Sequence, residues 1–355
     1  MLIVSQKQRR IFVMKYIVPD GCYFRSVAGV EFHAGEKLPD NYRLKKGDML
    51  LSQDYRYDYL GRNTGGWHIS VKDPRKEEYE SILSDIAGKP VISMYQTFWG
   101  CTSLKTAPKI PDSVMNMTDT FANCTSLTTA PAIPDSVTNM RGTFIGCESL
   151  TTAPTIPSSV TDMYRTFSGC TSLTTAPEIP NSVTNMSRTF YNCWSLTTVP
   201  DLPDGLIDMD HTFRDCKALT TAPKIPNSVT DMDYTFADCS SLTTAPDLPN
   251  GLTDMYATFR GCTSLTAAPA IPDGVVDMTY TFQDCSSLKE PPVIPEGVIS
   301  MNFAFEGCSS LEEKPELPST VENADGIFEG TPFDKNQDIS EPEIDASEPE
   351  QDEER

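Results

Sequence analysis

Residues 167–190 read FSGCTSLTTAPEIPNSVTNMSRTF. This stretch decides the fold because nearly the same sequence precedes and follows it. Its first phenylalanine recurs every 23 residues without a slip, at Phe98, Phe121, Phe144, Phe167, Phe190, Phe213, Phe236, Phe259, Phe282, Phe305 and Phe328. A fixed period of about 20 to 50 residues is typical of supersecondary units that bury their apolar faces only by stacking. We therefore expect residues 92–333 to form one solenoid of 23-residue coils.

The apolar residues of each repeat occupy nearly constant columns. In one repeat they are Leu127, Ala130, Ile133, Val137, Met140, Phe144 and Cys147. Spacings of three and four without long alternation fit neither a single amphipathic helix nor an ordinary strand. They predict a coil that turns around a central apolar axis, with stability shared between neighbouring coils.

Backbone conformation within a coil is constrained by proline and by small residues. The prolines of the recurring Ala-Pro-x-Ile-Pro segment have no backbone N–H to donate to a neighbouring strand. We therefore expect this segment to be an extended corner. Parallel strands are then expected along Val-Thr-x-Met, with Leu-Thr-Thr as a possible second short strand. Residue types that tolerate a left-handed turn follow the phenylalanines by two positions, at Gly100, Asn123, Gly146, Gly169, Asn192, Asp215, Asp238, Gly261, Asp284 and Gly307.

The units Thr-Phe-x-x-Cys-x-Ser-Leu-Thr-Thr and Ile-Pro-x-Ser-Val-Thr-x-Met resemble the BspA-like leucine-rich repeat proteins of bacteria. The stretch NSVTNMSRTFYNCWSL, residues 181–196, carries the resemblance best, and about two thirds of the chain shares it. The resemblance implies an α/β to mainly β fold, a leucine-rich-repeat parallel solenoid. It also implies a role in protein recognition, often at a bacterial surface.

The region before the repeats divides into three parts. Residues 1–14 are expected to be a non-native start or disordered. Residues 15–72 predict a small β-rich domain, because Tyr55, Tyr57 and Tyr59 alternate before a Gly-rich turn and a second alternating run follows. Residues 73–91 predict a capping helix and linker, with Asp73 as helix cap and Gly88 as terminator. That helix would cover the open end of the first coil.

Charge is distributed unevenly along the 355 residues, whose formal net charge is −22. Residues 1–72 carry +5 and residues 334–355 carry −8, which leaves −19 for residues 73–333. Such an acidic solenoid repels phosphate, so direct nucleic-acid binding is not expected. Residues 334–355 lack apolar content and predict an acidic disordered tail.

Ten of the eleven cysteines occupy one repeat column, which points to inward-facing free thiols and not to a disulfide framework. Free thiols and the absence of a signal peptide predict a cytoplasmic protein, whereas the family resemblance makes the cell surface an alternative. No stretch is long and apolar enough to predict a membrane span.

Functional information is expected in the columns that vary, above all the two residues after each methionine. Tyrosine and arginine recur there, and both are typical of protein-interface hot spots. We predict that a protein partner binds residues Tyr95, Arg141, Tyr164, Arg165, Arg188, His211, Tyr234, Tyr256, Tyr280 and Phe303. The alternative is an ordinary solvated ridge whose aromatic stems pack sideways.

The column before methionine is rich in Asn and Asp, which the sequence explains best as turn and backbone capping. A cation stripe along Asp208, Asp231, Asp254 and Asp277 is the less favoured alternative. No nucleophile–base pair or phosphate loop interrupts the repeat, so neither catalysis nor a cofactor is predicted. Two further functional alternatives remain: a structural or adhesive surface array, and an acidic decoy that mimics nucleic acid.

Overall fold

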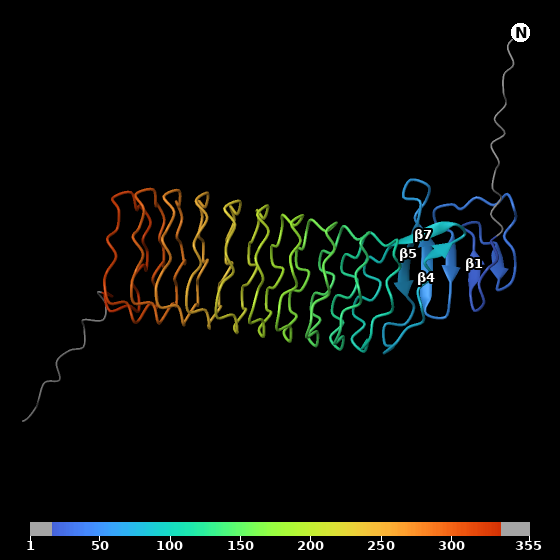
Figure 1. The fold of residues 1–355 in the computed structure, drawn as a ribbon, viewed down its shortest axis with the longest axis horizontal. Coiled ribbons are helices and arrows are strands. Elements are labelled where there is room, and N and C mark those ends of the chain that lie inside the picture. Colours follow the sequence, from blue (N-terminus) through green and yellow to red (C-terminus); the bar gives the residue numbers. More distant parts are fainter. Residues whose placement is uncertain (1–15, 335–355) are drawn as a thin grey trace, which may run out of the picture.

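The computed structural model describes residues 16–334, which form seven short strands followed by a long stack of coils (Figure 1). The strands are β1 (Tyr23–Arg25), β2 (Glu31–His33), β3 (Met49–Leu51), β4 (Tyr55–Tyr59), β5 (Trp67–Val71), β6 (Asp85–Ile86) and β7 (Lys89–Ser93). They make one sheet in the order β2-β1-β3-β4-β5-β7-β6. The predictions for residues 1–14 and for nearly all of the acidic tail concern residues outside the described range.

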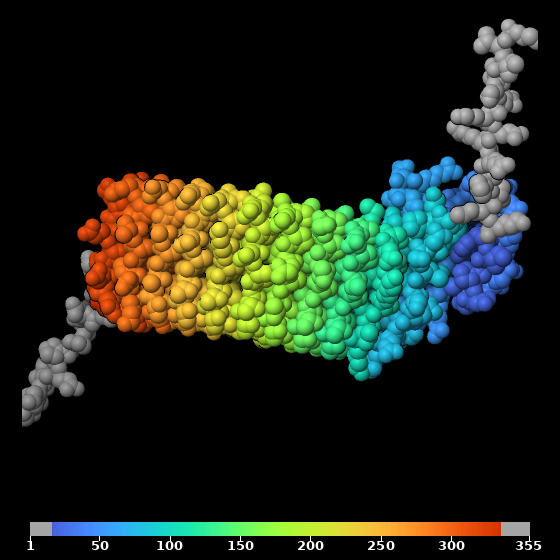
Figure 2. All heavy atoms as spheres, in the orientation of Figure 1, coloured from blue at the N-terminus to red at the C-terminus, as the bar shows by residue number. Residues whose placement is uncertain are grey.

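The predicted hairpin is β4 and β5, which pair antiparallel with Tyr57 opposite Ile69 and Tyr59 opposite Trp67. Strand β7 pairs parallel with β5, and its last residue, Ser93, bridges onward to Asn116 in the first coils. The sheet therefore passes directly into the solenoid. Figure 2 shows the result, in which the blue N-terminal region and the coils form one continuous rod.

Two ladders of isolated parallel bridges join the coils. One runs through the residue before methionine, as in Asn185 to Asp208, and the other through the second threonine of Leu-Thr-Thr, as in Thr152 to Thr175. Both positions agree with the predicted pairing, yet neither extends into a regular strand. Prolines on one side and tight turns on the other limit each ladder to one residue per coil.

Two consecutive tight turns follow the first ladder in each coil. Thr212 N–H donates to the Met209 carbonyl (2.9 Å), and Cys216 N–H donates to the Phe213 carbonyl (3.0 Å). The third residue of each turn, His211 in one and Asp215 in the other, has a positive φ, which is the geometry of a type II turn. In the second turn all ten residues predicted to adopt a left-handed conformation do so.

The core is a column of stacked phenylalanine rings along the solenoid axis. Consecutive centroids lie between 5.2 Å, for Phe98 and Phe121, and 6.1 Å, for Phe305 and Phe328, with the planes nearly parallel. The rings from Phe98 to Phe305 are fully buried. Successive Phe-x-x-Cys units thus align one above another, which confirms the stacking that the 23-residue period predicted.

Cysteine and threonine complete the core by satisfying backbone carbonyls. The Cys193 thiol donates to the Phe167 carbonyl (3.2 Å), and the buried Thr189 hydroxyl donates to the Met163 carbonyl (2.8 Å). Every cysteine among the described residues is free and buried. Burial raises the pKa of Cys147 to about 12, so this thiol stays neutral and unreactive near pH 7.

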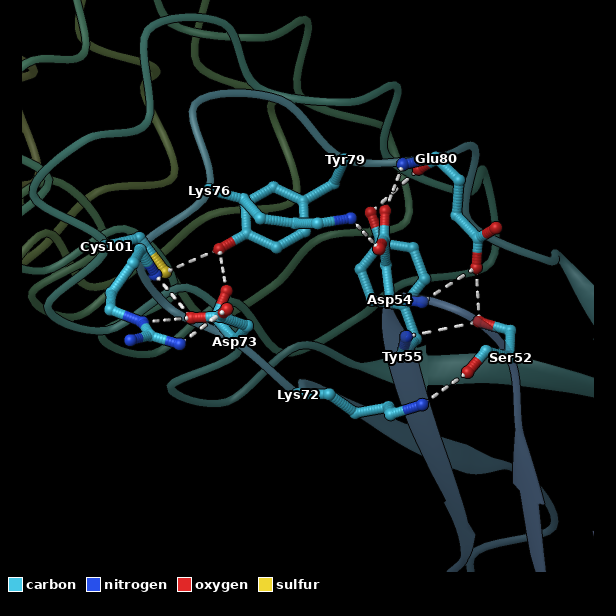
Figure 3. Close-up of polar contacts among 10 residues, drawn as sticks. Ser52, Asp54, Tyr55, Lys72, Asp73, Lys76, Tyr79, Glu80 and Cys101 are labelled. Carbon is cyan, nitrogen blue, oxygen red and sulfur yellow. Dashed lines mark hydrogen bonds and ion pairs between the residues drawn. The ribbon is translucent and has the colours of Figure 1, made fainter.

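The predicted capping helix over residues 73–91 is wrong, because residues 16–334 contain no helix. Side chains from the sheet satisfy the backbone of this segment instead (Figure 3). Asp54 accepts the Glu80 N–H (2.8 Å), and the Tyr57 hydroxyl accepts the Leu83 N–H (3.1 Å). Gly88 has φ 69° in the tight turn between β6 and β7, so it does not terminate a helix. Long-range hydrogen bonds therefore override the local helical pattern.

The same segment still covers the end of the first coil. The Tyr79 ring lies 5.2 Å from Phe98 and 6.0 Å from Tyr55. Its hydroxyl is 3.4 Å from the Cys101 sulfur (Figure 3). Asp54 is buried and paired with Lys76, which anchors the segment to the sheet. An irregular, hydrogen-bonded strap thus protects the terminal phenylalanine from water. None of the described residues forms a helix suited to crossing a membrane.

Candidate functional site

The ridge is defined here as the two residues that follow each methionine of the repeat, from Tyr95 to Phe303. Both residues lie at the centre of the first tight turn; Ser187, Ala257 and Thr279 are buried there, and the other side chains of the ridge reach the surface wholly or in part. Arg141 and Arg165 are exposed, whereas Tyr164, Arg188 and the remaining predicted residues other than Tyr95 are partly buried against neighbouring coils. Stacking of coils brings most of the predicted binding residues into one continuous row.

The second residue of each ridge pair has a left-handed backbone, as does Gly326 at the same repeat position beyond the ridge. The residues concerned are Gln96, Asp119, Gly142, Arg165, Arg188, His211, Tyr234, Ala257, Tyr280, Phe303 and Gly326, with φ between 51° and 60°. Only two of them are glycine, although the neighbouring turn uses Gly, Asn or Asp throughout. A left-handed conformation costs a non-glycine residue about 1–2 kcal/mol. Such strain concentrates at functional positions, where the surrounding structure enforces it.

Hydrogen bonds between coils hold these strained residues in place. The N–H of Arg188 donates to the Asp210 carbonyl (2.8 Å), and the N–H of Tyr280 donates to the Asn302 carbonyl (2.9 Å). The sequence did not reveal this conformation, because the residue types at these positions argue against it. The only signals were Gly142 and Gly326 in the same column.

Aromatic side chains dominate the C-terminal half of the ridge. The His211 and Tyr234 rings lie 4.5 Å apart, and the row continues through Tyr256 and Tyr280 to Phe303 with spacings of 5.2–5.5 Å. Burial and then hydrogen bonding with Tyr234 raise the pKa of Tyr256 to about 12, so its hydroxyl stays protonated. The rings therefore form a rigid, partly exposed apolar strip with polar edges.

Arginines dominate the N-terminal half of the ridge and surround Tyr164. The guanidinium carbons of Arg141 and Arg165 lie 4.7 and 5.2 Å from the centre of its ring, and Arg188 donates to its hydroxyl (3.4 Å). Arg141 also pairs with Asp162 (2.9 Å). Tyr95 lies apart from this cluster; it is 45% exposed and makes no ring contact within residues 16–334.

A cavity of about 380 Å³ opens between the two halves, and we call it the arginine pocket. Its polar lining comes from Arg165, Ser168, Arg188, Tyr191, His211 and Arg214. The sequence analysis did not predict Tyr191 and Arg214, which follow a phenylalanine and not a methionine. A usable signal existed, since all five arginines of residues 92–333 fall within these two adjacent turns.

A larger cavity, of about 620 Å³, lies in the N-terminal region beside Tyr16, Tyr42 and Tyr59. It opens where the described chain begins and is lined by none of the ridge residues. The arginine pocket is therefore the better candidate, because it joins the predicted binding residues to a concave surface.

The Asn and Asp column before methionine caps the first turn. Asp208 accepts the Asp210 N–H (3.0 Å), and Asp254 accepts the Tyr256 N–H (2.9 Å). Within the described chain no group of three or more His, Cys, Asp or Glu residues is arranged to hold a metal ion. Crowding nevertheless affects Asp233, whose pKa rises to about 7 through burial and then through Asp254 and Asp231.

The repeat is similar to a known family of proteins. Residues 92–220, 142–266 and 207–332 match a family model described as BspA type leucine rich repeat region, in 6 copies. This match covers more than half of the chain and indicates a repeat scaffold, with no enzyme family among the matches. No curated protein sequence matches the chain.

Three solved structures are similar to this chain, and the first of them supports the leucine-rich-repeat fold. A leucine-rich repeat protein from Bacteroides ovatus is 22% identical, with a TM-score of 0.50, over 79% of this chain and 91% of that one. One from Eubacterium ventriosum is 16% identical, with a TM-score of 0.48, over 80% and 94%. A leucine rich cell surface protein from Faecalibacterium prausnitzii is 20% identical, with a TM-score of 0.36, over 81% and 96%.

Proposed function

The chain belongs to the BspA-type leucine-rich repeat family, and we propose that it is a non-catalytic scaffold that binds a partner protein through the ridge. The observation that carries this proposal is the left-handed backbone of bulky ridge residues such as Arg165, Tyr234 and Phe303. Glycine would relieve the strain at each of these positions. Large side chains are present at these positions because of the contacts that they make outside the coil.

Preorganisation is the mechanism of binding. Hydrogen bonds between coils fix the ridge backbone, and ring stacking fixes the aromatic side chains before any partner arrives. Binding then costs little side-chain entropy, so several anchors on neighbouring coils act together. Tyrosine and arginine are suited to this role because each combines a large contact area with polar groups.

Charge distribution favours this proposal over the acidic-decoy alternative. A nucleic-acid mimic would present carboxylates on its binding face, whereas the ridge and the adjoining turn hold all five arginines of the solenoid. The ridge itself carries three arginines and the three aspartates Asp119, Asp210 and Asp233, so it is formally neutral whereas the chain as a whole is acidic. An aromatic face of balanced charge within an acidic surface suits a protein partner.

Location at a cell surface is a second part of the proposal. The cytoplasmic prediction rested on free thiols and on the absence of a signal peptide, but every described cysteine is buried and donates inward or packs in the core. Buried neutral thiols react slowly with oxidants, so they do not require a reducing compartment. Burial therefore removes the thiol argument for a cytoplasmic protein, and an adhesive surface array stays an alternative function of the same scaffold.

The test compares two triple variants of the full chain. The ridge variant combines Tyr164→Ala, Arg165→Ala and Arg188→Ala; the control combines Thr174→Ala, Glu178→Ala and Asp201→Ala, which are exposed residues outside the ridge. Immobilised wild type and variants are incubated with the same cell extract, and captured proteins are quantified by mass spectrometry. We expect at least one protein to be retained by wild type and control but to fall about tenfold or more with the ridge variant.

Melting temperatures are measured alongside, and that of the ridge variant should stay close to that of the control. If the ridge variant captures the same proteins as the control, the ridge is not the binding face. If it unfolds at the assay temperature, its side chains belong to the scaffold and the proposal fails.

A further inference from the structure

The arginine pocket has a charge opposite to that of the molecule. The chain carries 50 acidic and 28 basic residues, yet no acidic residue lines this cavity. Three of its lining residues, Arg165, Arg188 and Arg214, come from three consecutive coils. Stacking of the coils therefore concentrates positive charge where the ridge, with Arg165 and Arg188, meets the second turn, with Arg214.

The guanidinium groups in the pocket are incompletely paired. Arg165 forms no side-chain hydrogen bond or ion pair within residues 16–334, and its only side-chain contact of note is the face of Tyr164. Arg188 reaches the Tyr164 hydroxyl at 3.4 Å and Asp210 at 3.5 Å. Both distances are long for charge-assisted hydrogen bonds, which are typically about 2.7–2.9 Å.

The Arg214 side chain lacks a hydrogen-bond partner more clearly. Its Nε–H is buried and has no hydrogen-bond acceptor, which makes it one of only two such side-chain atoms among the described residues. The closest carboxylates, Asp215 and Asp238, lie 3.8 and 4.0 Å from this nitrogen. Its guanidinium carbon lies 5.8 Å from the Tyr191 ring centre and 4.9 Å from that of Tyr234. A buried donor without an acceptor is costly unless a ligand supplies one.

Nearby carboxylates pair with the pocket arginines only at long distance. Asp210 is already engaged by the His211 ring and by Arg188; although burial opposes ionisation, these contacts lower its pKa and keep it charged. Burial and then Asp238 raise the pKa of Asp215, so this carboxyl holds its negative charge less firmly. The Arg165 guanidinium and the Arg214 Nε–H remain available to an anion.

We propose that the arginine pocket binds one anionic side chain of the partner protein, either a carboxylate or a phosphorylated residue, while the aromatic strip packs against the flanking residues. This inference rests on the proposed function and specifies the chemistry of the partner. A planar guanidinium fork matches both carboxylate and phosphate oxygens. The cavity, at about 380 Å³, has room for a side chain.

A single anionic side chain fits better than a polyanion. The surrounding molecule has a net charge of −22, so a nucleic acid or an anionic membrane would be repelled over most of its contact area. One charge confined within the pocket avoids this repulsion because it meets the guanidinium groups at close range. Nearby acidic surface is screened beyond about 8 Å at physiological salt.

The experiment titrates the full chain with three capped amino acids and follows binding by calorimetry and by NMR at physiological salt. N-acetyl-glutamate amide and N-acetyl-phosphoserine amide supply the two anions, and N-acetyl-glutamine amide is the neutral control. We expect both anions, or one of them, to bind with a Kd of about 1 mM and the neutral probe not to bind, since such small ligands gain about 0.3 kcal/mol per atom. The tighter of the two anionic probes identifies the source of the charge.

Variants locate the site. Arg165→Gln and Arg214→Gln should each weaken anion binding about tenfold, whereas Arg260→Gln, whose side chain bonds Gln283 and does not line the pocket, should leave it unchanged. Arg165 is exposed, so its variant is expected to fold even if the Arg214 variant does not. Equal binding of the neutral probe, no binding of either anion, or an equal loss with Arg260→Gln would overturn the inference.

This outcome is separable from that of the proposed function. If neither anion binds but the ridge variant still loses its captured protein, only the pocket inference fails. If an anion binds in the pocket but capture does not depend on the ridge, the proposed partner binding fails instead.

Discussion

The Tyr280 and Phe303 rings lie 5.2 Å apart with planes 5° from parallel, although both residues have a left-handed backbone. The two facts are connected, because the turn geometry places equivalent side chains one coil apart at stacking distance. Each aromatic contact contributes about 0.5–1.5 kcal/mol, which offsets part of the backbone strain of about 1–2 kcal/mol per residue. The ridge therefore has a strained backbone that contacts between neighbouring coils hold in place.

Arg165 allows that strain to be measured, because its side chain is exposed and stacks only on Tyr164. We expect Arg165→Gly to be more stable than Arg165→Ala by about 0.5–1 kcal/mol, since glycine adopts φ 56° without the steric cost. Urea denaturation of both variants checks this difference. An alanine variant as stable as the glycine variant would show that the backbone at this position is relaxed.

Asp233 should make stability depend on pH. Its pKa in the folded chain is about 7, well above the ordinary 3.8, because burial and neighbouring carboxylates disfavour its charge. The associated stability is present below about pH 4 and is lost as pH rises through 7. Asp233→Asn should therefore raise the urea midpoint at pH 8 and flatten its change between pH 8 and 5.

The control for this prediction is Asp273→Asn, which removes the same formal charge from an exposed position away from the ridge. Its pH profile should follow that of the wild type. Matching effects of the two substitutions would show that overall net charge, and not the environment of Asp233, controls the pH dependence.

The cysteine column should resist modification in the folded chain and destabilise it in alkali. Burial raises the pKa of Cys147 to about 12 and shifts that of Cys170 in the same direction, so neither thiol ionises when folded near pH 9. Unfolded thiols ionise there, which lowers the unfolding free energy by about 1.4 kcal/mol per pH unit for each thiol. A thiol reagent at pH 8 should label the native chain slowly and all eleven cysteines in urea.

Alkaline unfolding gives the second readout for the thiols. A Cys147→Ala, Cys170→Ala variant should show a shallower loss of stability above pH 9 than the wild type. Rapid labelling of the native protein would contradict the buried position of the column.

Tyr79 should protect the N-terminal end of the solenoid. Tyr79→Ala uncovers the Phe98 ring. We expect the free energy of unfolding to fall by about 2–4 kcal/mol and the variant to self-associate, because an apolar coil edge becomes exposed to water. Tyr79→Phe keeps the ring and removes only the contacts to Asp73 and Cys101, so it should cost about 1 kcal/mol. Denaturation and light scattering measure the two effects, and equal losses for both variants would assign the stability to the hydroxyl alone.

Much of the architecture could be read from local regularity. The 23-residue period predicted the stacked phenylalanines, and the Gly, Asn and Asp column predicted the left-handed residues of the second turn. The Asn and Asp column before methionine was predicted to cap backbone groups, and Asp208 does so. The stacking prediction succeeded because it depends on contacts between identical positions of adjacent repeats, and the turn and cap predictions succeeded because they depend on residues within one turn.

The sequence alone determined the solenoid, its core columns and its family, because stacking buries the same apolar positions in every coil. Only the tertiary structure decided the rest: the strap formed by residues 73–91 in place of a helix, the strained ridge, and the pocket where Arg165, Arg188 and Arg214 meet. The reason is that these features depend on side chains from different coils or from the N-terminal sheet. Their hydrogen bonds and ring contacts overrule the local preference of the residues involved.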